Sequence, residues 1–153
     1  MHFYNVMKKI AENKAVDLYI DMDGVIAAYD IGGNPYDFLN KRPLTSNISN
    51  IKEVLSIENV NLHILSVCRE NSQVEDKNIW LDKNAPFFKK ENRCIISRES
   101  KDWMNSKEIK LNFFNDLETD NQVVLVDDDN QILRTIKDSI ANVIVMQDSE
   151  LVD

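Results

Sequence analysis

The stretch VDLYIDMDGV, residues 16–25, decides the fold of this chain of 153 residues. Its first five residues form an apolar run, broken by a single acid, of the kind found in buried parallel strands. Asp21 and Asp23 follow directly, and Gly24 lets the backbone turn away sharply. The stretch therefore predicts a core strand that delivers two carboxylates to one edge of a sheet.

Working outward from this stretch, apolar runs and helical patterns alternate along the chain. Four further runs predict strands at residues 62–65, 94–96, 123–126 and 143–146. Apolar spacing predicts helices at residues 3–13, 46–57, 72–82, 107–117 and 130–140, with Ser106 as the N-cap of the fourth. This alternation is typical of an α/β fold in three layers, with helices on both faces of a central, mostly parallel sheet.

The chain is long enough for one domain, and no internal repeat divides it. We expect residues 1–153 to form a single domain, in which residues 27–46 form a short flap between the first strand and the next helix. Hydrophobic residues make up 43% of the chain and charged residues 29%, which is ordinary globular composition. The sequence leaves the oligomeric state open, with a homo-oligomer as one option.

Charge and cysteine content exclude several classes of function. The net charge of −8 disfavours a dedicated nucleic-acid binder, although residues 77–110 hold nine basic and five acidic side chains. No apolar run approaches the ~20 residues of a membrane span. Two distant cysteines, Cys68 and Cys94, fit reduced thiols, and the first twenty residues lack the pattern of a signal peptide. We therefore expect a cytoplasmic protein with no membrane partner.

Polar side chains follow several of the predicted strands. Besides Asp21 and Asp23, Ser66 follows the run at 62–65, Lys101 comes shortly after the run at 94–96, and an Asp127–Asp129 triplet follows the run at 123–126. Because the carboxyl ends of parallel strands meet at one edge of a sheet, these groups should line one crevice. Clustered carboxylates repel unless a cation lies among them, and oxygen ligands with room for phosphate suit Mg²⁺.

These residues, in this order, resemble the four motifs of the haloacid dehalogenase (HAD) superfamily of phosphohydrolases. The resemblance spans about residues 16–147 and rests on DMDGV at 21–25, ILS at 64–66, Lys101 and VDD at 126–128. Within the superfamily, DMDGV followed by Ala27, Ala28 and Tyr29 is most similar to the 5'(3')-deoxyribonucleotidase branch, as is the segment from Lys77 to Leu81. The resemblance implies a Rossmann-like α/β/α fold with strand order 5-4-1-2-3.

The resemblance also implies a role for each matched residue. Asp21 would be the nucleophile that forms an aspartyl-phosphate, and Asp23 would protonate the leaving oxygen and then activate water. Ser66 and Lys101 would bind the phosphoryl oxygens. Mg²⁺ would be held by Asp21, by the backbone carbonyl of Asp23, and by a carboxylate of Asp127 or Asp128.

Several alternatives stay open. Lys107 is a rival to Lys101 as the motif lysine, and either Asp127 or Asp128 could be the metal ligand, whereas Asp129 is expected to stabilise the following helix start. Tyr29 could stack on a base or sugar.

The expected function is a Mg²⁺-dependent phosphomonoesterase acting on small phosphorylated substrates, foremost nucleoside monophosphates. The alternatives are a phosphatase of nucleic-acid ends or of another small phosphate ester, and a catalytically silent module that binds phosphate and metal.

Overall fold

A computed structural model describes residues 2–30, 33–34 and 36–152 of the chain. Its strands are β1 (Val16–Ile20), β2 (Val60–Cys68), β3 (Arg93–Ser97), β4 (Gln122–Asp127) and β5 (Val143–Gln147). Its α-helices are α1 (His2–Ala11), α2 (Thr45–Glu53), α3 (Ser72–Asn84), α4 (Ser106–Asp116) and α5 (Asn130–Ser139). Each predicted strand and helix is present, with ends that differ by a few residues.

All five strands run parallel in the order β3-β2-β1-β4-β5, which is the predicted order read from the other edge. In the centre of the sheet, Ile20 pairs with Ile64 of β2 on one side and with Val126 of β4 on the other. This register brings the carboxyl ends of β1, β2 and β4 to the same edge. The prediction of a parallel α/β sheet is confirmed.

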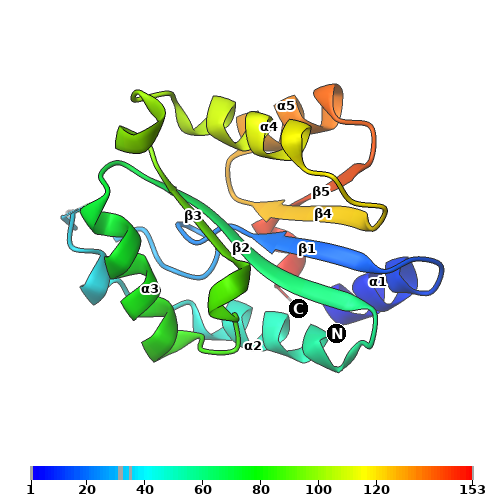
Figure 1. The fold of residues 1–153 in the computed structure, drawn as a ribbon. Coiled ribbons are helices and arrows are strands. Elements are labelled where there is room, and N and C mark those ends of the chain that lie inside the picture. The colour runs from blue at the N-terminus through cyan, green and yellow to red at the C-terminus, as the bar shows by residue number, and fades with distance from the viewer. Residues whose placement is uncertain (1, 31–32, 35, 153) are drawn as a thin grey trace.

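Helices cover both faces of the sheet and give three layers (Figure 1). Helices α4 and α5 lie on one face, and α1, α2 and α3 lie on the other. Side chains of β1 alternate between the two cores: Leu18 and Ile20 face the α1–α3 side, whereas Tyr19 faces α4 and α5. The protein is therefore a three-layer, Rossmann-like α/β/α domain.

The two ends of the insert after β1 are hydrogen-bonded to each other. The amide of Ala28 donates to the carbonyl of Arg42 at 2.9 Å, and the amide of Leu44 donates to the carbonyl of Ile26 at 2.8 Å. Between these contacts lies a short 3-10 helix, Phe38–Asn40, whose Phe38 packs edge-on against Trp80 of α3. The predicted flap at 27–46 thus closes against α3, although its residues 31, 32 and 35 lie outside the described residues.

Two local details correct or refine the sequence interpretation. The N-cap of α4 is Asn105 rather than Ser106, because the Asn105 side chain accepts from the Glu108 amide at 2.9 Å. Asp129 caps α5 by accepting from the amides of Gln131 and Ile132, as its expected structural role requires. Within the described residues, no helix has the length and apolar character needed to cross a membrane.

The single acid inside β1 is satisfied by a polar network at the amino end of the sheet. Asp17 is buried and accepts hydrogen bonds from Asn61, Thr119 and Asn121 at 3.0–3.4 Å. A buried carboxylate is tolerated only when its oxygens are bonded in this way. Asp17 therefore ties β2 and the segment before β4 to the central strand, on the edge opposite Asp21.

We expect Asp17→Ala to destabilise the protein by about 1–3 kcal/mol, because the donors around it lose their acceptor. Urea unfolding followed by circular dichroism measures this change. Asp138→Ala, at an exposed position of α5, is the control and should change stability by less than about 0.5 kcal/mol. Equal stability of the two variants would contradict a structural role for Asp17.

Candidate active site

The site begins where β1 ends. The amide of Asp21 donates to the Val126 carbonyl at 3.0 Å, so the first residue after β1 is still bound to β4. Gly24 has φ +78°, and a Cβ at this position would clash with the Asp128 carboxylate. Glycine is needed here both for its backbone conformation and for its lack of a side chain. This turn places Asp21 and Asp23 beside the end of β4.

Three carboxylates form the acidic part of the site. Oxygen atoms of Asp21, Asp127 and Asp128 all lie within 4.8 Å of one another. Asp21 and Asp127 are buried, and Asp128 is half-buried. Three carboxylate oxygens this close together form a hard donor set that could hold a metal ion.

A buried lysine from α4 balances part of this charge. Nζ of Lys110 lies 2.6 Å from Oδ2 of Asp127 and 3.1 Å from Oδ1 of Asp21. Both oxygens of Asp127 are engaged by protein donors, because its Oδ1 accepts from the Asp129 amide at 3.0 Å. Asp128 and Asp21 are therefore better placed than Asp127 to give oxygens directly to a metal.

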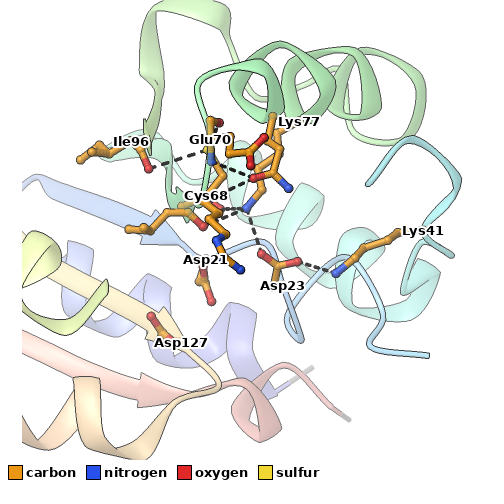
Figure 2. Close-up of polar contacts among 12 residues, drawn as sticks. Asp21, Asp23, Lys41, Cys68, Glu70, Lys77, Ile96 and Asp127 are labelled. Carbon is orange, nitrogen blue, oxygen red and sulfur yellow. Dashed lines mark hydrogen bonds and ion pairs between the residues drawn. The ribbon is translucent and has the colours of Figure 1, made fainter. Parts of the chain in front are cut away.

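A second group surrounds Asp23 (Figure 2). Nζ of Lys77, from α3, donates to Oδ2 of Asp23 at 2.9 Å and to Oγ of Ser66 at 2.7 Å. Nζ of Lys41, from the insert, donates to Oδ1 of Asp23 at 2.7 Å. Asp23 is thus held between two lysines, one from a helix and one from the flap.

A cavity of about 220 Å³ opens on this second group. It is bounded by Asp23, Tyr29, Tyr36, Phe38, Lys41, Val67, Cys68, Arg69, Gln73 and Lys77. A larger hollow of about 640 Å³ lies between α1 and α2, but its lining has no cluster of reactive groups. The grouping of charged side chains, rather than cavity size, therefore assigns the site.

Burial and neighbouring charges shift the pKa values of these groups in opposite directions. Burial raises the pKa of Asp21, helped by Asp127 and Asp23, although Lys110 opposes the shift. Burial and the neighbouring Asp127 raise the pKa of Asp128 to about 6. Burial alone would also raise the pKa of Asp23, but the ammonium groups of Lys77 and Lys41 outweigh it and lower the pKa.

Lys110 stays charged for a related reason. Burial would lower its pKa, but Asp21 and Asp127 outweigh burial and raise it. The site therefore holds an acidic half around Asp21 that repels further negative charge and a lysine-rich half around Asp23 that attracts it. On charge alone, the first half favours a cation and the second half favours an anion.

The structure brings together Asp21, Asp23, Ser66, Asp127 and Asp128, as the sequence predicts, but it corrects the lysine. Lys101 is exposed in the 3-10 helix Glu99–Lys101 and borders a different cavity, formed with Met104 and Ile109. The side chains of Lys101 and Lys107 make no hydrogen bond or ion pair with the described residues. Lys110 contacts Asp21 in place of either.

Lys77, Lys110 and Lys41 were not identified as site residues from the sequence. A signal existed for two of them: Lys77 precedes Leu81 by four residues, and Lys110 precedes Phe114 by four, so each lysine lies on the buried face of its helix. A buried lysine needs a carboxylate partner, and the aspartates after the predicted strands are the available partners in the sequence. Lys41 lies in a loop without periodicity, so no such signal marks it.

The other residues considered from sequence are placed as follows. Tyr29 borders the cavity and is 67% exposed, which leaves its ring available for stacking. Cys68 also borders the cavity, and burial raises the pKa of its thiol, as expected of an unreactive cysteine. His63 stacks on Tyr19 with ring centroids 4.6 Å apart and lies 3.8 Å from the carboxylate of Asp17, at the amino end of the sheet.

Comparisons with known proteins bear on the fold. No protein-family model matches this sequence, and no curated protein matches it. Among solved structures, a chain from the structure of the Pnkp1/Rnl/Hen1 RNA repair complex is similar, with a TM-score of 0.67 and 19% sequence identity. The match covers 89% of this chain and 43% of that chain, so this chain spans less than half the length of its neighbour. This likeness supports the α/β/α fold alone.

We expect Mg²⁺ to stabilise the protein more at pH 8 than at pH 5. A carboxyl group whose pKa is higher in the folded than in the unfolded state binds its proton more tightly when folded. Stability without metal therefore falls as the pH rises from about 4 through 6 for Asp128, and further for Asp21. At pH 8, saturating Mg²⁺ should raise the Tm by about 5 °C or more.

Thermal unfolding with and without about 10 mM Mg²⁺ measures this shift. A ligand at roughly 100 times its Kd stabilises the state that binds it. Asp128→Asn should remove most of the Mg²⁺-dependent shift. Asp120→Asn, at an exposed position before β4, is the matched control and should retain it. A shift of the same size in both variants would mean that Mg²⁺ binds elsewhere.

Proposed function

We propose that this chain is a Mg²⁺-dependent phosphomonoesterase of the HAD type, which works through an aspartyl-phosphate on Asp21. The observation that carries the proposal is the pairing of two half-sites at one sheet edge. Asp21, Asp127 and Asp128 offer three oxygens within 4.8 Å. Directly beside them, Asp23 is held by Lys77 and Lys41, and Lys77 also binds Ser66.

The donor set fits Mg²⁺ better than a softer metal. All three carboxylates offer oxygen, and the thiol of Cys68 donates instead to the Glu70 carbonyl. Asp21 and Asp128 would hold the ion, with the backbone carbonyl of Asp23 as a further ligand. When bound, Mg²⁺ offsets negative charge so that a carboxylate and a phosphoryl group can approach each other.

The chain's own residues would then carry out two displacements. A carboxylate oxygen of Asp21 forms a bond to phosphorus as the ester P–O bond breaks, and Asp23 gives a proton to the departing oxygen. The negative charge of the bound phosphoryl group would raise the pKa of Asp23, which the two lysines lower in the absence of substrate, so that Asp23 can carry this proton. In the second step Asp23 takes a proton from water, which attacks phosphorus and releases Asp21 and phosphate. Lys110 holds Asp21 in place through both steps.

Ser66 is suited to donate to a phosphoryl oxygen, and the charge of Lys77 is suited to stabilise that oxygen. Ser66 accepts from Lys77, so its own O–H is left to donate to a phosphoryl oxygen. The positive charge of Lys77 lies between Asp23 and Ser66, where negative charge on the equatorial oxygens would develop. Lys77 would thus offset phosphoryl charge, as the sequence resemblance expects of Lys101, whereas Lys110 is the lysine that contacts Asp21.

Nucleoside monophosphates are the substrates that we propose. The cavity beside Asp23 has aromatic side chains on its rim, among them Tyr29 and Tyr36, both partly exposed. Aromatic rings of this kind stack on bases and sugars.

The proposal keeps the cytoplasmic location expected from the cysteines, since Cys68 and Cys94 both carry free thiols.

A phosphatase of nucleic-acid ends is the second candidate. Arg69 borders the cavity, is exposed, and its guanidinium makes no hydrogen bond or ion pair with the described residues. The phosphodiester next to the terminal phosphate of a nucleic acid could bind to this guanidinium. Mononucleotides remain the first choice because the chain as a whole carries a net charge of −8. A silent module is disfavoured because every group needed for both displacements is present.

The first test is phosphate release from a panel of ribo- and deoxyribonucleoside monophosphates and an oligonucleotide with a terminal phosphate. We expect Mg²⁺-dependent turnover of mononucleotides, and a loss of at least about 10³-fold in Asp21→Asn, which removes the nucleophile. Turnover of the oligonucleotide alone would favour the second candidate. Full activity in Asp21→Asn would refute the mechanism.

A second test concerns Lys110, the lysine that contacts Asp21 in place of Lys101. Lys110→Met should lower kcat by about 100-fold or more, because it leaves Asp21 without its positioning cation. Lys101→Met should keep kcat within about twofold, because Lys101 lies on the rim of a separate cavity. Steady-state kinetics on the best mononucleotide measures both, with circular dichroism to confirm folding. The reverse ranking would restore Lys101 as the motif lysine.

A further inference from the structure

Two lysines beside Asp23 differ in how much of their hydrogen-bonding capacity the protein uses. Lys77 donates all three ammonium hydrogens within the protein: to Asp23, to Ser66 and, at 3.2 Å, to the Val67 carbonyl. Lys41 makes a single hydrogen bond, to Oδ1 of Asp23, within the part of the chain that the structure describes. Lys41 therefore keeps two donors for a ligand.

Lys41 is also held firmly in position. Its ammonium lies 4.8 Å from the ring centroid of Tyr29 and 5.1 Å from that of Phe38. Its backbone carbonyl accepts from the indole Nε1 of Trp80 at 2.9 Å, which fixes the end of the flap on α3. The spare donors of Lys41 are thus presented from a rigid support rather than from a mobile surface chain.

The position of Lys41 is at the entrance of the site. Its side chain is 15% exposed, whereas that of Lys77 is 3% exposed. It borders the cavity beside Asp23 and a second cavity of about 180 Å³ formed by the flap itself. Any group that occupies the cavity beside Asp23 would therefore lie against this ammonium.

Asp23 has another partner, which lies deeper than Lys41. Its charge is already offset by Lys77, which lies deeper and binds the other oxygen at 2.9 Å. A second ammonium on a carboxylate that is already paired brings excess positive charge to the side of the cavity. Excess charge with spare donors is a feature of ligand recognition rather than of packing.

We propose that Lys41 is a specificity-determining residue that contacts the leaving group of the phosphate ester, an inference that rests on the proposed phosphatase activity. While one hydrogen stays on Asp23, the others donate to oxygen atoms of the leaving group next to the ester bond. The class of substrate selected is a phosphate ester of an oxygen-rich alcohol, such as a sugar or nucleoside. An apolar alcohol offers Lys41 nothing to bind.

The test compares two substrates whose leaving groups are both primary alcohols. Benzyl phosphate has no oxygen acceptor beyond the ester, whereas a nucleoside 5'-monophosphate has a ring oxygen and hydroxyl groups nearby. Lys41→Met removes charge and donors but keeps a flexible chain against Tyr29 and Phe38. We expect kcat/KM to fall about 10- to 100-fold for the nucleotide and less than about threefold for benzyl phosphate.

Two further variants separate recognition from indirect effects. Lys41→Arg keeps charge and donors and should recover a substantial part of the nucleotide activity. Lys137→Met, at an exposed position near the end of α5, is the matched control and should leave both substrates unchanged. Thermal unfolding of each variant checks that the fold is intact.

The outcomes distinguish the two proposals. Equal losses for both substrates in Lys41→Met would show that Lys41 only positions Asp23, and would overturn its role in recognition. Hydrolysis of benzyl phosphate by the unmodified protein, without hydrolysis of any nucleotide or sugar phosphate, would also overturn it and leave the phosphatase standing. No hydrolysis of any ester would refute the proposed function itself.

Discussion

The structure depends on how four carboxylates are kept at one edge of a parallel sheet. Asp21, Asp23, Asp127 and Asp128 meet there because β1 and β4 are neighbours in register. Buried carboxylates without partners would cost several kcal/mol each. Lys110 and Lys77 meet that cost from opposite faces of the sheet, one from α4 and the other from α3.

This arrangement explains why both helical layers matter to the site. Each layer presents one lysine on the inward face of a helix, among apolar neighbours such as Phe114 and Leu81. The apolar contacts orient the helix, and the helix orients the ammonium. The flap adds Lys41 from a third direction, and Trp80 joins the flap to the same helix that carries Lys77. The geometry around Asp23 is thus set by core packing as much as by charge.

The division of the site into two halves follows from the same contacts. Around Asp21, carboxylates predominate, and their pKa values are raised. Around Asp23, lysines predominate, and its pKa is lowered. The proposed chemistry would place a metal cation in the first half and a phosphoryl anion beside the second, so it would use a charge asymmetry that the fold already contains.

The sequence by itself determined the α/β class, the strands and the placement of Asp21, Asp23, Ser66 and Asp127, because apolar runs and the polar residues that follow them are local features. It also indicated the role of Asp129 as a cap. Only the tertiary structure decided which lysines join the site. Lys101 comes closely after a strand but projects elsewhere, whereas Lys110 and Lys77 reach the aspartates from helices distant in sequence. The direction in which a long side chain points depends on how its helix packs on the sheet, and local sequence does not encode that packing.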